Sequence, residues 1–261
     1  MAFLGDYHTH TIHSRRKGWP FLHAKGTIED NVQAASDLGL KEIAITDHGF
    51  NHRVFCTYIK NYPKFRAEIE ELKKKYNINI LLGVEANLIG RNGEIDVKPQ
   101  DKPLLDIILC GYHVNVRPNS LRDKFGLFYY NYILSLFGLK KGRIRRNTQS
   151  YIKMLENNDI DILVHMNAGM FLVDAVEVAK AAVKKGTLIE LNNRHMNFTK
   201  EEIDKMAELG VKFIANSDAH RPGNVANFAK IRAKIAEYNI PKENIVNWDN
   251  LPEFINYKRG K

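Results

Sequence analysis

The sequence predicts an α/β fold of the barrel type, and three observations lead to that prediction. Seven short apolar segments alternate along the chain with segments of helical character. The apolar segments are continuous runs, which is typical of parallel strands covered on both faces. Most of them run directly into a histidine or a carboxylate, and the carboxyl ends of barrel strands share the mouth where barrel enzymes keep their chemistry.

The predicted strands are spread over almost the whole chain. Four of them end in histidine, one ends in Glu85, one ends in both Asp218 and His220, and one ends in the amides Asn192 and Asn193. Their ranges are 3–10, 42–48, 80–85, 107–113, 162–165, 187–193 and 213–220. Seven strands are one fewer than the common eight, so we expect an irregular barrel.

Helical segments follow the strands, as right-handed crossovers between parallel strands require. The first helix has a capping-box pattern that starts at Thr27, and Gly39 is a stop signal. The predicted helices cover residues 27–38, 58–76, 148–157, 171–185, 199–209 and 224–237. Because the chain has no internal repeat or linker, we predict a single barrel domain over residues 1–261.

Composition constrains the setting of the protein. The chain has 261 residues, of which 44% are hydrophobic, and this suffices for one barrel-sized core. Its two cysteines, Cys56 and Cys110, are too few for a disulfide framework and fit a reducing compartment. The amino terminus does not resemble a signal peptide, and no apolar run has membrane-spanning length. We therefore expect a cytoplasmic protein with no membrane partner, and its oligomeric state stays open.

The segment 115–147 interrupts the alternation of strands and helices and is strongly basic. It holds eight basic residues and one acid, a net charge of +7, out of +9 for the whole chain. The stretch from Phe125 to Leu139 is also rich in aromatic side chains. We predict an insertion or lid at about 115–147, with a fixed helical cap, a mobile lid and a dimer contact as alternatives. Its charge indicates either a solvated surface or a field that attracts an anionic substrate.

The strand ends carry a set of metal-ligand residues. His8 and His10 are two positions apart on a strand, so their side chains point the same way and can share one ion. Burying so many imidazoles and the Glu85 carboxylate without a cation would leave polar atoms unsatisfied. The set exceeds what one tetrahedral zinc ion accepts, so it favours two or three ions. The predicted metal ligands are His8, His10, His23, His48, Glu85, His113, His165, Asp218 and His220.

The motifs together resemble the PHP (polymerase and histidinol phosphatase) superfamily over almost the full length of the chain. The pattern Asp6-x-His8-x-His10 is similar to the first family motif, and Thr46-Asp47-His48-Gly49 is similar to the second. Gly83-x-Glu85-Ala86-Asn87 and Ser217-Asp218-Ala219-His220 fit two later motifs. His23, in the first loop, resembles the extra histidine of trinuclear members.

The resemblance implies a distorted (β/α)7 barrel, with three divalent ions at the carboxyl ends of the strands. It implies one ion on His8, His10, Glu85 and Asp218 and a second on Glu85, His113 and His165, with Glu85 bridging the two. It implies a third ion on His23, His48 and His220, either alone or with Asp218 shared. Histidine-rich sites accept zinc, iron or manganese, so the identity of the ions stays open.

Several further residues have predicted roles around the metal site. Asp47 could orient a ligand from behind, although core hydrogen bonding is an alternative. Arg221, directly after His220, is the arginine best placed to bind a second anionic group of the substrate, with Arg143, Arg145, Arg146 and Arg194 as alternatives. We expect His13 near the surface or behind a ligand, and His52 and His195 in solvent.

The predicted function is hydrolysis of a phosphate ester of a small metabolite by metal-bound hydroxide, with Glu85, Asp218, Asp47 and Arg221 as catalytic residues. Histidinol phosphate is one substrate that the resemblance implies. A nuclease or nucleotide phosphoesterase acting on an oligonucleotide or nucleotide is an alternative, supported by the basic and aromatic segment. A non-catalytic, regulatory metal-binding module is another. An amidohydrolase is disfavoured because no lysine stands at the strand ends.

Overall fold

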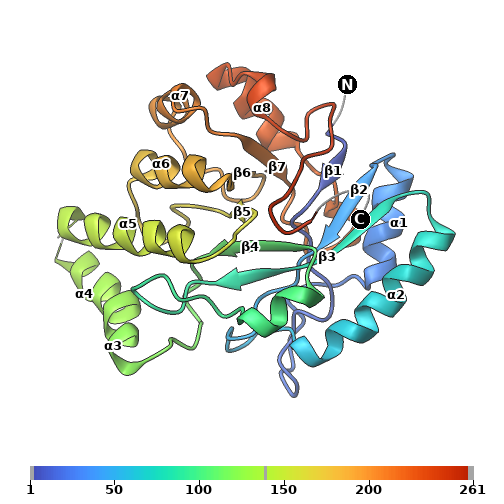
Figure 1. The fold of residues 1–261 in the computed structure, drawn as a ribbon, viewed down its shortest axis with the longest axis horizontal. Coiled ribbons are helices and arrows are strands. Elements are labelled where there is room, and N and C mark those ends of the chain that lie inside the picture. The colour runs from blue at the N-terminus through green and yellow to red at the C-terminus, as the bar shows by residue number, and fades with distance from the viewer. Residues whose placement is uncertain (1–2, 138–139, 258–261) are drawn as a thin grey trace.

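Seven parallel strands form the centre of the molecule, in an order that follows the sequence from β1 to β7. The fold is that of a computed structural model, which describes residues 3–137 and 140–257. Figure 1 shows the strands surrounded by helices, as the sequence predicts. The strands are β1 (Gly5–Asp6), β2 (Glu42–Ile45), β3 (Asn79–Asn87), β4 (Ile107–Gly111), β5 (Ile162–Leu163), β6 (Leu188–Asn192) and β7 (Phe213–Asn216).

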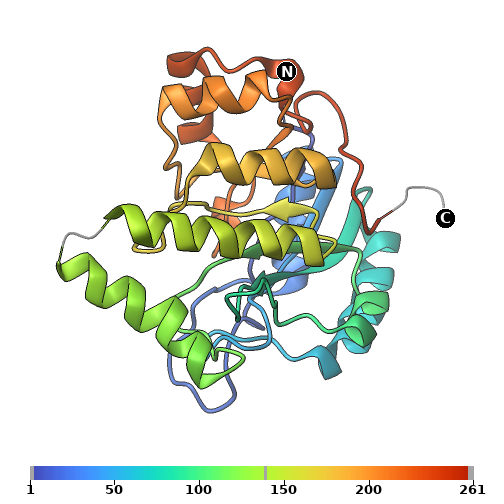
Figure 2. The same cartoon turned by 60° about the vertical axis from the view of Figure 1, so that its left-hand side comes forward.

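Helices follow the strands on the outside of the sheet. The α-helices are α1 (Ile28–Asp37), α2 (Tyr62–Lys75), α3 (Leu121–Asp123), α4 (Tyr130–Leu136), α5 (Lys140–Asn157), α6 (Ala175–Lys185), α7 (Lys200–Glu208) and α8 (Ala229–Tyr238). A π-helical stretch, η3 (Lys124–Tyr129), joins α3 to α4, and short 3₁₀ helices cover 59–61, 99–104, 222–224 and 242–244. Helices α5, α6 and α7 lie side by side in Figure 2, on one side of the strands. In the described part of the chain, no helix combines the length and apolarity that crossing a membrane would take.

The predicted element types are confirmed, whereas several boundaries differ. Helix α5 begins at Lys140, eight residues before the predicted start, because a run of basic side chains on an exposed helix face does not stop a helix. Helix α6 begins later than predicted, at Ala175, where the side chain of Asp174 accepts a hydrogen bond from the Glu177 amide at 3.1 Å. Helix α8 begins at Ala229, after a 3₁₀ turn.

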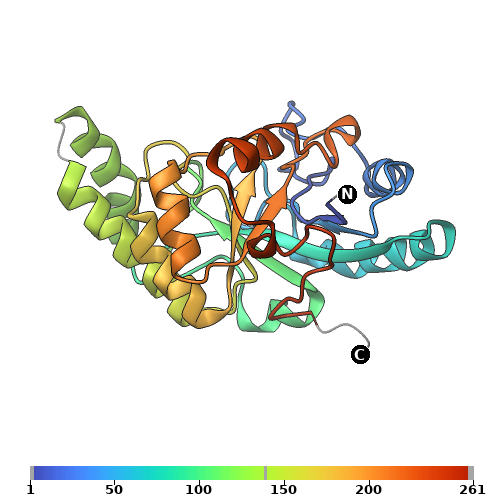
Figure 3. The same ribbon diagram turned by 90° about the horizontal axis from the view of Figure 1, so that it is seen from above.

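Part of the segment 115–147 belongs to a helical hairpin that projects from the barrel. Helices α4 and α5 pack against each other and extend from one end of the molecule (Figure 3). Arg143 is buried and donates a hydrogen bond to the carbonyl of Asn131 at 3.1 Å, which ties the two helices together. Gly138 and Leu139, within the predicted apolar stretch, lie outside the described residues.

Two apolar layers hold the barrel. Along β3, Leu81 belongs to an inner cluster, whereas its neighbours Ile80 and Leu82 belong to an outer cluster between the strands and the helices. This alternation is the period of two expected of a strand covered on both faces. Because Glu85 follows Leu81 by four residues, the same period turns its side chain inward at the barrel mouth.

The seam between β1 and β7 is closed largely by side chains. A parallel bridge joins Thr9 to Ala219, and the His10 amide donates to the Ala219 carbonyl at 2.8 Å. Buried Asn247 donates to the carbonyls of Gly5 (3.0 Å) and Ala215 (2.7 Å), and its side-chain oxygen accepts from the Ala215 amide (3.0 Å). Strand β1 is therefore shorter than the predicted 3–10, because amide side chains replace part of its ladder.

Replacing Asn247 with alanine should destabilise the barrel, because two carbonyls and one amide at the seam lose their buried partners. We expect the free energy of unfolding to fall by about 2–4 kcal/mol in urea denaturation. Asn250→Ala, which removes an exposed side chain with a single 3.4 Å contact to the Trp248 carbonyl, should change it by less than about 0.5 kcal/mol. Equal effects of the two substitutions would contradict the role of Asn247 in closing the barrel.

Candidate metal centre

Glu85 lies at the centre of a group of histidines at the mouth of the barrel. Its carboxylate is 1% exposed and stands near the end of β3. Oxygen atoms of Glu85 lie 2.6 Å from His48 Nδ1 and 2.6 Å from His165 Nε2. Three more imidazole nitrogens lie within 4 Å of the carboxylate, those of His113 (3.1 Å), His8 (3.3 Å) and His10 (3.7 Å). Four different strands thus converge on one carboxylate.

Several atoms of this group have no hydrogen-bond partner among the described residues. They are both ring nitrogens of His10, both of His48, Nε2 of His8 and Oε2 of Glu85. The short contact between His48 and Glu85 lacks hydrogen-bond geometry, so it does not satisfy either group. A buried polar atom without a partner costs about 1–3 kcal/mol. Divalent cations would accept these lone pairs, so the donor set fits a metal centre.

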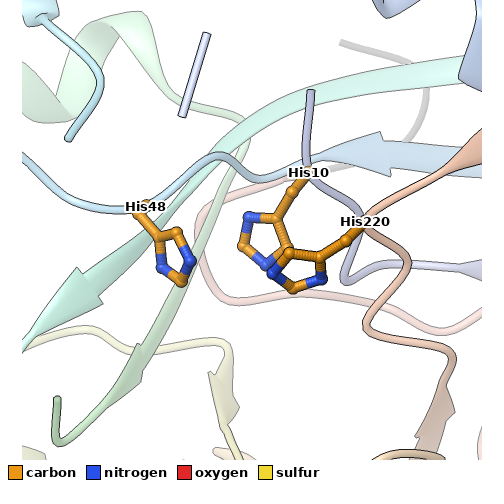
Figure 4. A group of neighbouring side chains, drawn as sticks. All are labelled: His10, His48 and His220. Atoms are coloured by element: carbon orange, nitrogen blue, oxygen red, sulfur yellow. The ribbon is translucent and has the colours of Figure 1, made fainter. Parts of the chain in front are cut away.

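Three overlapping groups of ligand atoms are close enough together to hold an ion each. His8, His10 and Glu85 form one group, and this agrees with part of the first predicted set. The other two groups are His48 with Glu85 and His113, and His10 with His48 and His220. Figure 4 shows the last three rings turned toward a common space.

The position of His48 differs from the expected division of ligands. The resemblance placed His48 only with His23 and His220, whereas the structure also brings it against Glu85 and His113. His23 nevertheless reaches the site, because its Nε2 lies 2.8 Å from Nε2 of His220. Its ring stacks on Phe55 at a centroid distance of 3.9 Å, which holds the first loop over the site.

Unusual backbone conformations direct two of these side chains. Asp218 has φ of 55° and His165 has φ of 31°, in the left-handed region that side chains other than glycine rarely adopt. Such conformations persist where the surrounding structure enforces them, often at functional sites. Gly111 provides space for His165, because a Cβ at that position would lie 2.8 Å from the His165 ring.

Asp218 forms a second acidic position beside Glu85. One of its carboxylate oxygens lies 3.3 Å from His220 Nδ1, 3.5 Å from His10 Nε2 and 3.9 Å from His8 Nε2. It also lies 3.4 Å from a guanidinium nitrogen of Arg194. The predicted acidic residues Glu85 and Asp218 are therefore brought together with the predicted histidines.

The charge states of Glu85, His10 and His23 suit cation binding. Burial raises the pKa of Glu85, but the neighbouring His113 and His48 outweigh it and hold the pKa well below its ordinary value. Burial, reinforced by His220, lowers the pKa of His10 to about 3 and that of His23 to about 4. Charged carboxylates and neutral imidazoles are the forms that bind divalent ions.

Glu190, on β6, supports the histidines from behind and was not among the predicted site residues. Its carboxylate accepts from His8 Nδ1 at 2.7 Å and from the His165 amide at 2.9 Å. It also accepts from the side chains of Asn192 (2.9 Å) and Asn216 (3.0 Å). Burial lowers the pKa of His8, but Glu190 and Glu85 outweigh it and raise the pKa well above its ordinary value. The sequence signal that could have identified Glu190 is a single carboxylate within an otherwise apolar strand.

A second supporting chain orients His113. Buried Asp96 accepts from the Asn87 side chain at 2.6 Å, and Asn87 Oδ1 contacts His113 Nδ1 at 2.8 Å. Partners of this kind fix the ring orientation of metal-binding histidines. Asn87 belongs to a motif recognised in the sequence, whereas Asp96 had no sequence signal.

Asp47 holds the loop after β1 and does not contact a ligand ring. Its carboxylate accepts from the amide and hydroxyl of Thr11, both at 2.7 Å, and from the Ser14 hydroxyl at 2.6 Å. Ser14 in turn accepts from the His48 amide at 3.1 Å. The predicted influence on His48 is therefore exerted on its backbone, through a serine.

A cavity of about 240 Å³ opens onto the group, and its lining shows which of the predicted anion-binding arginines lie beside the site. Arg194 borders it, and one guanidinium nitrogen lies 2.7 Å from His220 Nδ1. The side chain of Arg221 is exposed and does not line the cavity, so the structure does not bring this predicted residue into the site. Arg221 has extended backbone (φ −150°, ψ 147°), a conformation in which neighbouring side chains leave opposite sides of the chain. Arg143 is a structural residue, and Arg145 and Arg146 do not line the cavity.

The remaining histidines either pack behind the site or lie near the rim of the cavity. The prediction that His52 is solvated is wrong: it is 7% exposed, and its Nδ1 accepts from the Phe55 amide at 2.9 Å. Its ring stacks beside His48 at 5.4 Å, so it packs behind a site residue. His13 is partly buried against Phe65, and half-exposed His195 borders the cavity.

The barrel and its histidine cluster define a protein of the (β/α)7 class with a candidate metal centre at the carboxyl ends of the strands. The family model of the PHP domain matches residues 6–215. A relative from Clostridium acetobutylicum, described as a probable phosphatase, is 28% identical in an alignment that covers 100% of this chain and 96% of that protein. A probable phosphatase from Clostridium botulinum strain Langeland is 32% identical, over 95% of this chain and 91% of its own.

A solved structure has the same fold. The histidinol phosphate phosphatase of Lactococcus lactis, in complex with zinc, L-histidinol and phosphate, superposes with a TM-score of 0.55 and 16% identity. The match covers 92% of this chain and 95% of that one. The chain belongs to the PHP domain family.

Replacing Glu190 with glutamine should weaken metal binding, because it removes the negative charge behind His8. We expect metal affinity to fall by about 10–100-fold, measured by competition with a chelator of known affinity. Glu201→Gln, on an exposed turn of α7, is the matched control and should leave affinity unchanged. The same affinity in both variants would show that Glu190 does not support the centre.

Proposed function

We propose that this protein is a metal-dependent phosphatase that hydrolyses a phosphate ester of a small metabolite. The observation that carries the proposal is the buried Glu85 carboxylate among five imidazoles, several with nitrogens that find no hydrogen-bond partner in the described part of the chain. The probable phosphatases among the relatives and the histidinol phosphate phosphatase of the same fold support it. We take residues 1–261 as one PHP-type barrel domain, with the segment at about 115–147 as an insertion or lid.

We further propose that the centre holds three divalent ions. The ligands would be the nine residues predicted from the sequence, with Glu85 shared between ions, and His48 shared as well because two groups contain it. When bound, ions of this kind polarise phosphoryl oxygens and lower the pKa of a coordinated water. Zinc, iron and manganese all suit imidazole and carboxylate donors.

The chain's own side chains would position the ester. Arg194 stands at the rim of the cavity with a guanidinium group, which matches the geometry of phosphate oxygens. Asp218 and His220 hold that guanidinium in place, at 3.4 Å and 2.7 Å. Glu190, Asn87 and Asp96 would keep the imidazoles oriented while the ester binds.

The size of the cavity favours a small ester over a polynucleotide. A volume of about 240 Å³ suits a phosphoryl group with a compact substituent. Of the basic residues of the segment 115–147, Arg146 stacks on Tyr130 at 4.3 Å, and neither Arg145 nor Arg146 lines the cavity. We therefore place a small phosphorylated metabolite ahead of a nucleic acid as the substrate.

Removing the metal should abolish hydrolysis, and returning it should restore activity. We expect a chelator to eliminate phosphate release from phosphomonoesters, and zinc, manganese or iron(II) to recover it. Glu85→Gln should lower turnover by more than about 100-fold, the upper effect of outer partners, and reduce the metal content per chain. Glu208→Gln, on the exposed face of α7, is the control. Full activity after complete metal removal would refute the proposal.

Replacing Arg194 with methionine should mainly raise KM, since it removes a guanidinium contact to the substrate phosphate. A charged hydrogen bond contributes about 1.5–3 kcal/mol, which corresponds to about tenfold or more in KM. Arg221→Met removes a guanidinium group that faces solvent, so it should change KM by less than about twofold. Steady-state kinetics of the two variants with one ester decide between the two arginines.

A further inference from the structure

A second cavity, of about 270 Å³, adjoins the metal-site cavity and has a different character. The two cavities share Tyr112, His113 and Val114, so His113 faces both. Because His113 also belongs to a ligand group with Glu85, the second cavity begins directly beside the metal centre. Together the two volumes fall in the range of small-molecule sites, about 300–1,000 Å³.

Apolar side chains form most of the second cavity. Leu88 and Ile89 follow β3 on one side, and Leu127 and Phe128 of η3 lie on the other. Leu88, Ile89 and Leu127 are buried, at 1%, 8% and 4% exposure, so these walls are fixed by packing. The π-helical turn that presents Leu127 and Phe128 is a rare conformation that occurs frequently at functional sites.

The π-helical stretch η3 is fixed in place where it borders this cavity. The Tyr112 hydroxyl donates to the Leu127 carbonyl at 3.4 Å, and the Tyr112 ring stacks on Phe171 at 4.1 Å. Gly126 allows η3 to approach closely, because a Cβ there would collide with the Arg91 side chain. The cavity is therefore part of the folded structure and not a gap between independent segments.

Two cations stand among the polar lining residues. Arg53 and Lys124 border the cavity, and no ion pair engages either of them within the described part of the chain. The one carboxylate of the lining, Asp123, is already occupied by Arg91 and by the Ser120 hydroxyl at 2.5 Å. The cavity thus combines an apolar interior with positive charge that its own acid does not neutralise.

We propose that this second cavity binds the leaving group of the substrate, and that the preferred substrates are phosphomonoesters of alcohols with a compact apolar ring and a distal anionic substituent. This inference rests on the proposed phosphatase function. In the hydrolysis, the oxygen of water bonds to phosphorus, the ester P–O bond breaks, and the alcohol departs with a proton from the water. The cavity would hold that alcohol through Phe128 and Leu127, and Lys124 would face its anionic end.

A polyhydroxylated leaving group fits this cavity less well. Its hydroxyls would lie against apolar walls and lose hydrogen bonds to water without replacement, at about 1–3 kcal/mol for each buried group. An apolar ring loses nothing on the same transfer and gains from leaving water. The cavity therefore discriminates by the polarity of the leaving group.

The test compares three esters on the metal-loaded protein: benzyl phosphate, 4-carboxybenzyl phosphate and glycerol phosphate. We expect kcat/KM for benzyl phosphate to exceed that for glycerol phosphate by about tenfold or more, and the carboxyl group to raise it further. Phe128→Ala should remove most of the preference for the ring, because it should lower kcat/KM for benzyl phosphate much more than kcat/KM for glycerol phosphate. Lys124→Met should remove only the added advantage of the carboxyl group. Phe137→Ala, which truncates a 72% exposed ring at the end of α4, is the matched control.

The possible results of this test distinguish failure of the leaving-group cavity from failure of the phosphatase function. Hydrolysis of all three esters at equal kcat/KM, or an equal loss with every ester in Phe128→Ala, would overturn the leaving-group cavity and leave the phosphatase function intact. If the metal-loaded protein hydrolyses none of these three esters and no other phosphoester, the phosphatase function is overturned. In that case calorimetry with benzylphosphonate and methylphosphonate decides on the cavity: tighter binding of the benzyl compound that depends on Phe128 supports it, and equal binding refutes it.

Discussion

The carboxylate of Glu85, buried among imidazoles, is the constraint on which the rest of the site depends. An isolated buried charge is too costly to be retained, and hydrogen bonds do not satisfy the facing nitrogens of His10 and His48. Cations resolve both problems, since they neutralise the carboxylate and accept the nitrogen lone pairs. Binding of cations also requires fixed imidazole orientations, and the supporting residues provide them. Glu190 orients the His8 ring, and the pair of Asn87 and Asp96 orients the His113 ring.

The barrel brings residues that are distant in the sequence together in one site. Predicted metal ligands that follow β1 and β7 meet only because the two edges of the sheet are joined, and Asn247 and the bridge from Thr9 to Ala219 make that junction. The left-handed conformations of Asp218 and His165 are located next to this convergence. Fold stability and metal geometry are therefore coupled at the seam, where packing must sustain unfavourable backbone conformations.

The sequence allowed the fold and the gathering of the histidines to be predicted, because both depend on local patterns. Continuous apolar runs identify covered parallel strands, and a polar residue at the end of such a run must face the barrel mouth. Glu190 escaped prediction because it lies within its run and its partners are 182 and 25 residues away in the sequence. Arg221 was favoured by its proximity to His220, yet the extended backbone turns neighbouring side chains in opposite directions, and Arg194 borders the cavity instead. The direction in which a side chain points, and hydrogen bonds between residues far apart in the sequence, can be read only from the three-dimensional structure.

Anomalous diffraction from crystals of the protein purified with its own metals tests the central claim most directly. The account predicts separate anomalous peaks around Glu85, each about 2.0–2.2 Å from imidazole nitrogens and carboxylate oxygens of the cluster. It also predicts that one peak shares the Glu85 carboxylate with another. A well-diffracting crystal of active protein with no anomalous density at the barrel mouth, and with hydrogen-bonded waters between His10, His48 and Glu85, would contradict it.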